Sequence, residues 1–246
     1  MDILIVTDNG LETVGGEQES TKIIINGVKD YFSVGVAQPG YVRNKATGVK
    51  YFNLTSKTRI QHLIKNPFSF LKYILKLRRI INEERPKVIH SQAQVSFFIV
   101  ALLKKFKLIS YRDFVFIHTE RGLYISYNVF FKKLFSFFMK ELDTLITTTK
   151  FNLGYWKNML TQQGLTVNYK VIENTAGQLF ESFEKTLVKR ESENLVLGFA
   201  GRYSEQKNWP LAIEIIKQLN KKIGNKLYIE MAVGCLDLKS EKKARE

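Results

Sequence analysis

Short apolar runs alternate with longer helical segments along most of this chain, and no other feature constrains its fold as strongly. The runs Ile3–Thr7, Lys87–Ser91 and Phe114–His118 have the length and β-branched content of buried strands. Between such runs, Pro67–Asn82 and Val95–Phe106 have the apolar spacing of helices. Strands that alternate with helices pair in parallel, because each crossover carries a helix over the sheet. The sequence therefore predicts an α/β fold with a doubly wound, mostly parallel sheet.

The same alternation sets the expected domain organisation. Further strands are expected at Ser33–Ala37, Val49–Leu54, Thr144–Thr148 and Tyr169–Ile172, and further helices at Glu17–Phe32, Asn128–Leu142 and Asn152–Gln163. After a charged stretch the pattern restarts, with a strand at Leu195–Ala200, a helix at Trp209–Ile223 and a strand at Leu227–Val233. We expect a Rossmann-like domain over residues 1–173, a linker over 174–194, and the first βαβ unit of a second Rossmann-like domain over 195–246.

A single βαβ unit buries its apolar surface poorly and is not a stable domain by itself. The second domain is therefore expected to be cut short. Three explanations remain open. Either the chain is a fragment, or a separate partner chain completes the second domain, or its elements dock on the first domain.

Composition narrows the class of protein and its partners. Among 246 residues, 45% are hydrophobic and 13% aromatic, which excludes a disordered polycation. The formal charge is +15, which predicts an anionic partner: nucleic acid, an anionic membrane surface or a phosphorylated substrate. The single cysteine, Cys235, cannot form an intramolecular disulfide, so the chain fits a reducing compartment or is indifferent to redox. The apolar start ends at Asp8 and has no basic segment before it, so no signal peptide is expected and a cytoplasmic location is. The apolar run Val95–Leu103 is about half a membrane span, so no transmembrane helix is expected.

A glycine pair, Gly15 and Gly16, precedes the first expected helix. Glycine allows close approach of the backbone, and a helix N-terminus offers free N–H groups and the positive end of a dipole. A phosphate is therefore a candidate ligand here. The pattern lacks the G-x-G-x-x-G of dinucleotide binding, and an ordinary turn is the alternative interpretation.

Two histidines, His90 and His118, lie at the ends of expected strands. Ligands of open α/β sheets bind at the carboxyl ends of the strands, so these residues lie at the expected crevice. The imidazole of His118 is a candidate to hydrogen-bond a sugar hydroxyl or to stabilise charge near a reacting carbon. A structural role at the strand end is the alternative for His118, and it is favoured for His90.

Arg202 and Lys207 follow the strand that restarts the pattern. Two cations between a strand end and a helix start suit a diphosphate, with Arg as a bidentate fork and Lys as a point charge. A solvated basic loop is the alternative. The sequence contains no Asp-x-Asp pair and no clustered His and Cys residues, so no metal cofactor is expected.

Taken in order, these segments resemble a glycosyltransferase of the GT-B fold, in the retaining group called glycosyltransferase family 4. The resemblance runs from Met1 to about Gly234 and rests on Gly15-Gly16-Glu17, Val88-Ile89-His90-Ser91, the strand ending in His118, Val171-Ile172-Glu173-Asn174, and Leu197-Gly198-Phe199-Ala200-Gly201-Arg202 with Lys207. The family joins two Rossmann-like domains across a cleft. Its N-terminal domain binds the acceptor and its C-terminal domain binds the nucleotide-sugar donor.

The resemblance also implies roles for individual residues. Arg202 and Lys207 would bind the donor diphosphate and stabilise the leaving nucleotide in place of a metal. Gly15 and Gly16 would approach the diphosphate and the acceptor, and His118 would contact the transferred sugar. The acceptor or sugar side would include Glu17, His90 and Glu120. The family's later Glu-x7-Glu motif and nucleoside pocket would lie beyond residue 246, which leaves the donor site incomplete and the activity of this chain alone open.

Much of the positive charge lies in two acid-free helical segments. The first presents Lys65, Lys72, Lys76 and Arg79 on one face, and the second, Val129–Lys140, presents Lys132, Lys133 and Lys140 among phenylalanines. Such helices suit an anionic membrane surface, although ordinary amphipathic helices that cover the sheet are the alternative. Nucleic acid is the weaker partner, because no RNP, KH or zinc-finger motif is present.

The leading hypothesis is a glycosyltransferase that moves a sugar from a nucleotide-sugar to a membrane-associated glycan or a lipid-linked acceptor. It would act without a metal, in envelope or capsular polysaccharide synthesis, at the inner face of the plasma membrane. A non-catalytic membrane-binding subunit that docks a separate donor-binding partner is the alternative. A nucleic-acid-binding α/β protein is a third reading.

Overall fold

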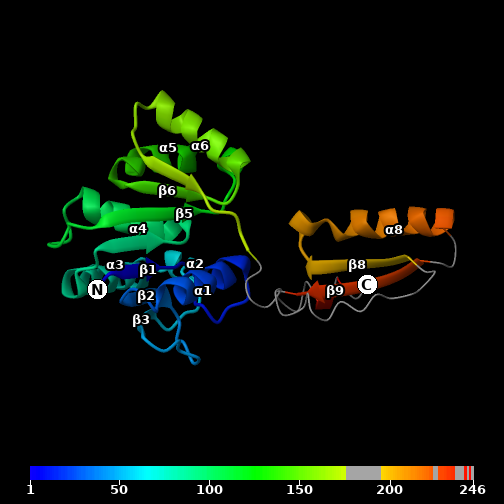
Figure 1. Cartoon of the computed structure of the whole chain (residues 1–246), viewed down its shortest axis with the longest axis horizontal. Coiled ribbons are helices and arrows are strands. Elements are labelled where there is room, and N and C mark those ends of the chain that lie inside the picture. The colour runs from blue at the N-terminus through cyan, green and yellow to red at the C-terminus, as the bar shows by residue number, and fades with distance from the viewer. Residues whose placement is uncertain (176–194, 224–226, 236–240, 243, 245–246) are drawn as a thin grey trace. The chain divides into compact units, whose positions relative to one another are not determined.

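The computed structural model describes residues 1–175, 195–223, 227–235, 241–242 and 244. The chain divides into two compact units, Met1–Phe180 and Glu181–Glu246 (Figure 1). The expected linker over 174–194 falls almost entirely outside the described residues. Each unit is described by itself.

The first unit is built on a seven-stranded sheet with the order β3-β2-β1-β4-β5-β6-β7. Every described pair of neighbouring strands in it is parallel. The strands are β1 (Ile3–Val6), β2 (Val34–Pro39), β3 (Val49–Thr55), β4 (Val88–Ser91), β5 (Val115–Glu120), β6 (Thr144–Thr147) and β7 (Asn168–Val171). The strand order reverses direction at β1 and β4, which is where open α/β sheets hold their ligands.

Helices cover both faces of this sheet, which confirms the doubly wound α/β fold. They are α1 (Gly16–Val28), α2 (Gln61–Ile64), α3 (Pro67–Glu84), α4 (Gln94–Lys105), α5 (Val129–Phe138) and α6 (Lys150–Gln162), with short 3-10 turns η1 (Tyr124–Ser126) and η2 (Met139–Glu141). Side chains alternate along β1: Leu4 and Val6 join the core under α3 to α6, whereas Ile5 packs with Ile25 of α1. We call these two sides of the sheet the α4 face and the α1 face.

Aromatic rings fill the centre of the α4 face. Phe97 of α4 stacks on Phe116 of β5 with centroids 5.7 Å apart, and on Phe135 of α5 at 5.4 Å. The ring of Trp156, from α6, meets Phe135 edge-on at 4.9 Å. These four rings have no exposed surface, so one aromatic cluster joins α4, α5, α6 and the sheet.

The α1 face is more open than the α4 face. Residues of β5 and β6 that point to the α4 face are buried, whereas those that point to the α1 face are largely half-buried. Val115 at the start of β5 is 46% exposed and Ile172 after β7 is 56% exposed. The α1 face beside these strands therefore has room for a cavity.

Local sequence explains where the helices begin. Pro67 occupies the first turn of α3, and the side chain of Asn66 accepts a hydrogen bond from Ser69 N at 3.1 Å. The side chain of Asn128 caps α5 in the same way, accepting from Phe131 N at 2.9 Å. Some expected bounds need correction. α1 ends at Val28 rather than at Phe32, and the helix expected to end at Leu142 is α5 followed by η2.

The second unit contains two parallel strands, β8 (Leu195–Arg202) and β9 (Leu227–Gly234). They are joined through η3 (Glu205–Lys207) and α8 (Trp209–Ile223), which is the βαβ unit that the sequence predicts. Trp209 and Ile216 are the buried side chains of α8 among the described residues, and the indole N–H of Trp209 donates to Arg202 O at 2.8 Å. Large apolar side chains on both α8 and β9 stay exposed.

Candidate functional site

The loop after β1 ties the central strand to α4. The carboxylate of Asp8 accepts backbone hydrogen bonds from Val95 N at 2.9 Å and Ser96 N at 2.7 Å. It thereby caps a helix whose own N-cap residue, Ala93, offers no side-chain acceptor. Burial raises the pKa of Asp8, and the two amide donors oppose that rise. We did not predict this residue, although an Asp directly after a buried central strand was a usable signal.

The N-terminus of α1 lies beside this loop and has no side-chain cap. α1 begins at Gly16, and Gly15 in its N-cap position supplies no side-chain acceptor. A Cβ on Gly16 would meet no atom within 4 Å, so the backbone here is open to an approaching group. Gly15, by contrast, lies against the side chain of Gln18. An anion at the glycine pair stays a prediction.

Glu17 carries an unusual carboxylate at the start of α1. Its Oε2 accepts from Asn9 Nδ2 at 2.7 Å, while its Oε1 is buried without a partner in the part of the chain described. Burial, together with the nearby charge of Asp8, raises the pKa of Glu17 to about 7. The guanidinium of Arg121 partly offsets this rise. A carboxyl that changes charge near neutral pH thus lies at the carboxyl ends of the strands, where a ligand is expected.

Glu17→Gln is expected to remove one source of pH dependence from stability. Because the pKa of Glu17 is raised on folding, its contribution to stability is present at low pH and is lost as pH rises from about 4.5 to about 7. The variant should therefore match the wild type near pH 5 and melt at a higher temperature near pH 8. Thermal unfolding across pH measures this, with Glu19→Gln on the exposed side of α1 as control. Parallel curves for Glu17→Gln and wild type would contradict the raised pKa.

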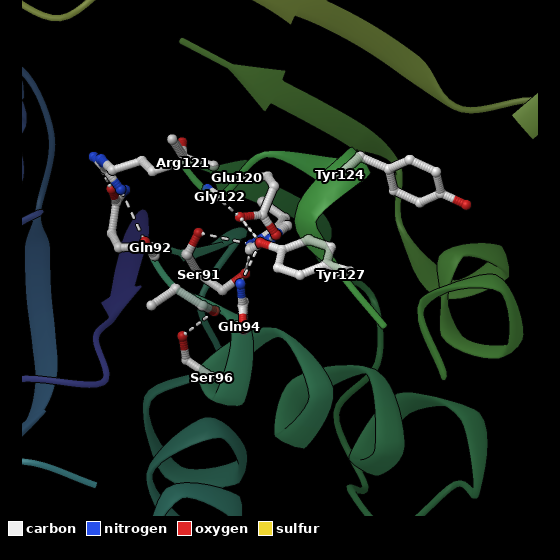
Figure 2. Close-up of polar contacts among 12 residues, drawn as sticks. Ser91, Gln92, Gln94, Ser96, Glu120, Arg121, Gly122, Tyr124 and Tyr127 are labelled. Carbon is white, nitrogen blue, oxygen red and sulfur yellow. Dashed lines mark hydrogen bonds and ion pairs between the residues drawn. The ribbon is translucent and has the colours of Figure 1, made fainter. Parts of the chain in front are cut away.

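His90 is held by a chain of hydrogen bonds that begins at Arg121, whose contacts with Gln92 are drawn in Figure 2. Arg121 donates from Nη1 to Gln92 O and from Nη2 to Gln92 Oε1, both at 2.8 Å. Since Gln92 Oε1 accepts, its Nε2 is the donor that lies 2.9 Å from His90 Nε2. His90 is then neutral with its proton on Nδ1, which agrees with a pKa lowered to about 3 by burial. We did not assign roles to Gln92 or Arg121 from the sequence, because their partners lie on different strands.

A cavity of about 200 Å³ opens on the α1 face next to these groups. It lies at the carboxyl ends of β4, β5, β6 and β7, beside α1. Its walls combine apolar side chains from α1 and the sheet with polar groups: Ser20, Ile23, Ile24, His90, Thr119, Arg121, Ile146, Thr148, Ile172, Glu173, Asn174 and Thr175. The expected acceptor-side residue His90 is therefore part of a real cavity.

His118 does not lie where the sequence placed it. The strand does not end there: β5 continues to Glu120, because Thr119 and Glu120 pair with Ile146 and Thr147. His118 consequently points to the α4 face, where its ring lies 4.6 Å from Phe97 and its side chain has no exposed surface. The side chain expected to contact a sugar is therefore buried, and that contact stays a prediction. Its Nδ1 lies 3.0 Å from Ser91 Oγ.

Glu120 is also buried rather than exposed to a ligand. It is 2% exposed, and its Oε1 accepts from Gly122 N at 2.6 Å and from the hydroxyl of Tyr127 at 2.9 Å (Figure 2). Its Oε2 lies 3.4 Å from His118 Nε2. The carboxylate therefore fixes the turn after β5, and the expectation that it faces an acceptor needs the same correction as for His118.

Arg202 and Lys207 both lie at the carboxyl end of β8 in the second unit. Arg202 ends β8, and the side chain of Lys207 passes over Gly201, where a Cβ would lie 3.7 Å from Lys207 Cγ. Both side chains are exposed, and neither forms an ion pair with a described acidic residue. Two exposed cations at one strand end suit a diphosphate, as the sequence indicates. The diphosphate itself stays a prediction.

The lysines expected at a membrane surface lie on outer helix faces. Lys72, Lys76 and Arg79 are exposed on α3 beside Phe68 and Leu71, while Leu77 and Ile81 are buried on its opposite face as expected. Lys65 is exposed directly after α2, and Lys133 and Lys140 are exposed on and after α5. Lys132 is half-buried, with its Nζ 5.3 Å from the ring centre of Tyr124. Contact of these residues with a membrane stays a prediction.

Among the described residues, no three His, Cys, Asp or Glu side chains come together as a metal site. Within the same ranges, every helix is too short or too polar to cross a bilayer. The structure thus gathers Gly16, Glu17 and His90 at one edge of the first unit. In the second unit, Arg202 and Lys207 both lie at the carboxyl end of β8.

Comparison with known proteins gives a fold but no family. No protein-family model and no curated protein matches this sequence. HepE from Anabaena in complex with UDP and glucose matches with a TM-score of 0.59 at 14% identity, covering 100% of this chain and 64% of HepE. The lipopolysaccharide outer core galactosyltransferase WaaB in its apo form gives 0.56 at 15% identity, with 100% and 64% covered. The UDP-forming α,α-trehalose-phosphate synthase from Burkholderia vietnamiensis gives 0.60 at 8% identity, with 100% and 67% covered.

These structures are GT-B glycosyltransferases, so the likeness shows a GT-B fold for this chain. The chain spans less than two thirds of the length of HepE and of WaaB, with 64% of each covered.

Proposed function

We propose, from the GT-B fold of this chain, that it belongs to a glycosyltransferase of the retaining family 4 type that uses a nucleotide-sugar donor. One observation carries the proposal. Two exposed cations that no described acid neutralises, Arg202 and Lys207, lie at the carboxyl end of the first strand of the second Rossmann-like unit. HepE, a protein of similar fold, has been solved with UDP and with UDP-glucose.

The two cations have a clear chemical task in this reaction. When the bond between the sugar and the nucleotide breaks, negative charge grows on the diphosphate. A guanidinium and an ammonium already in place stabilise that charge without having to reorganise. This is the work that a divalent metal performs in other enzymes, so we propose that transfer here is independent of metal.

The first unit supplies the acceptor side of the proposed site. Its cavity combines isoleucines with the neutral His90 and with Arg121, and it lies near the uncapped N-terminus of α1. A sugar presents both apolar C–H faces and hydroxyls, which suits such mixed walls. We propose that the acceptor is a membrane-associated glycan or a lipid-linked sugar of an envelope or capsular polysaccharide, at the cytoplasmic face of the plasma membrane. WaaB, which has a similar fold, is a lipopolysaccharide galactosyltransferase.

The full chain is expected to bind a nucleoside diphosphate or its sugar derivative, and EDTA should leave the affinity unchanged. Isothermal titration with UDP, ADP, GDP and their glucose derivatives measures this. Titration in high salt should weaken binding, because two charge-assisted contacts are involved. Binding that disappears with EDTA would contradict metal independence. If none of these nucleotides or nucleotide-sugars binds, the donor role of this chain is contradicted.

A non-catalytic subunit remains the second candidate, and the surface of the second unit favours it. Leu211 and Ile213 on α8 are 53% and 41% exposed, and Met231 on β9 is 52% exposed. An apolar surface of this kind fits a partner chain that supplies the rest of a donor-binding domain. In that case nucleotide binding should appear only after the partner is added.

A further inference from the structure

The loop after β5 and the first turns of α5 expose large apolar side chains to solvent. Leu123 is 46% exposed, Ile125 53%, Val129 67% and Phe130 68%. We call these four residues, together with Lys132 and Lys133, the β5–α5 surface. Isolated exposed apolar residues are common, but a cluster within eleven consecutive positions of the chain, 123–133, indicates an interaction site.

These side chains cannot simply turn inward, because the inner positions are already filled. Phe135 and Phe138 occupy the buried side of α5, and Phe135 stacks on Tyr127 at 5.4 Å. The hydroxyl of Tyr127 donates to Glu120 and accepts from Gln94 (Figure 2). Tyr124 N donates to Asn152 Oδ1 at 3.0 Å, which ties η1 to α6. The scaffold therefore holds Leu123, Ile125, Val129 and Phe130 outward.

The segment that carries this apolar cluster has charge of one sign. The sequence contains no Asp or Glu from Arg121 to Lys140, and Lys132 and Lys133 directly follow the exposed phenylalanines. Lys150 and Phe151, which is 63% exposed, lie beside Asn152 at the start of α6. An apolar centre with a cationic rim matches the boundary between acyl chains and anionic headgroups. A second copy of this chain would bring lysines against lysines, which disfavours self-association through this surface.

From these observations we infer that the β5–α5 surface docks on an anionic lipid bilayer, with Phe130 and Val129 at the acyl boundary and Lys132 and Lys133 on phosphate headgroups. The contact lies close to the candidate site. Leu123 is separated by Gly122 alone from Arg121, which lines the cavity on the α1 face. Docking would therefore hold that cavity near the headgroups, where a lipid-linked sugar is presented. Docking itself does not depend on the proposed function.

Flotation of the full chain with vesicles tests this inference. The wild type is expected to float with phosphatidylglycerol-containing vesicles and to stay unbound with phosphatidylcholine alone. Val129→Ser/Phe130→Ser should abolish flotation, whereas Tyr31→Ser/Phe32→Ser, a control at residues that are 81% and 49% exposed after α1, should not. Lys132→Gln/Lys133→Gln should weaken binding by up to about thirtyfold, since each lysine contributes about 1 kcal/mol. Lys221→Gln/Lys222→Gln in α8 removes the same charge elsewhere and should bind as the wild type does.

An environment-sensitive fluorophore locates the contact. It is attached at Phe130→Cys or, as control, at Phe32→Cys, both in a Cys235→Ser background that removes the one native cysteine. Anionic vesicles should shift the emission of the first to the blue and leave the second unchanged.

Equal binding to both vesicle types, no binding, or equal loss in test and control variants would overturn the inference. Lipid-independent dimerisation that the Val129→Ser/Phe130→Ser variant abolishes would assign the surface to a second copy instead.

Vesicle binding and binding of a nucleoside diphosphate can succeed or fail independently of each other. A chain that binds anionic vesicles through this surface but binds no nucleoside diphosphate supports docking and refutes the donor role. A chain that binds the nucleotide but no vesicle supports the donor role and refutes docking.

Discussion

Trp156→Ala is expected to lower the free energy of unfolding of the first unit by about 3–5 kcal/mol. The side chain has no exposed surface, and its ring meets Phe135 at 4.9 Å and Tyr124 at 4.7 Å. Removal of the indole leaves a cavity where α6, α5 and η1 meet. Phe135 and Tyr124 are held by their own packing and hydrogen bonds, so they cannot move in to fill it. Urea unfolding followed by circular dichroism measures the change.

Two variants make this prediction sharper. The buried indole N–H of Trp156 has no hydrogen-bond partner in the described chain, so Trp156→Phe loses volume but no bond and should cost much less than alanine. Phe151→Ala, in the same helix at a position 63% exposed, should change stability by about 0.5 kcal/mol or less. A Trp156→Ala protein that unfolds at the wild-type urea concentration would contradict the central role of the aromatic cluster.

Arg202→Gln/Lys207→Gln is expected to weaken binding of a nucleoside diphosphate by about a hundredfold or more. Each charge-assisted hydrogen bond is worth about 1.5–3 kcal/mol, and the variant removes both positive charges while keeping polar side chains. Folding should be unaffected, because both side chains are exposed and unpaired among the described residues. Isothermal titration gives the affinity, and nucleotide release gives turnover once an acceptor is found.

Single and control variants separate charge from shape. Arg202→Lys keeps the charge but loses the fork, so it should retain part of the affinity. Lys217→Gln/Lys221→Gln removes two charges from α8 and should bind as the wild type does. Wild-type affinity in Arg202→Gln/Lys207→Gln would refute the diphosphate role of this pair.

The order of strands and helices was predictable because it depends on local apolar spacing. The βαβ unit after residue 195 and the start of α3 at Pro67 followed from such signals. The end of β5 did not, because only pairing with β6 extends it beyond His118. The alternation of side chains along a strand was nevertheless visible in the sequence. Phe116 and His118 are two positions apart and share one face, so a buried phenylalanine predicts a buried histidine.

The parts of the site that sequence missed all depend on distant partners. Asp8 caps α4 by accepting a hydrogen bond from the backbone N–H of Ser96, which is 88 residues away along the chain. Arg121 orients Gln92 from the neighbouring strand across 29 positions. A local pattern cannot show that an aspartate finds a helix end or that an amide fixes the tautomer of His90. These residues become visible only when the sheet brings β1, β4 and β5 together.

The position of β1 in the sheet has a consequence for synthesis of the chain on the ribosome. β1 pairs with β2 on one side and with β4 on the other, where Ile3 lies opposite Val88. Until β4 has emerged, β1 has an open edge, with unpaired N–H and C=O groups that another chain can join. Asp8 likewise has no helix to cap before residues 95 and 96 appear. Nascent chains that stall between β3 and β4 should therefore be the ones most in need of a chaperone.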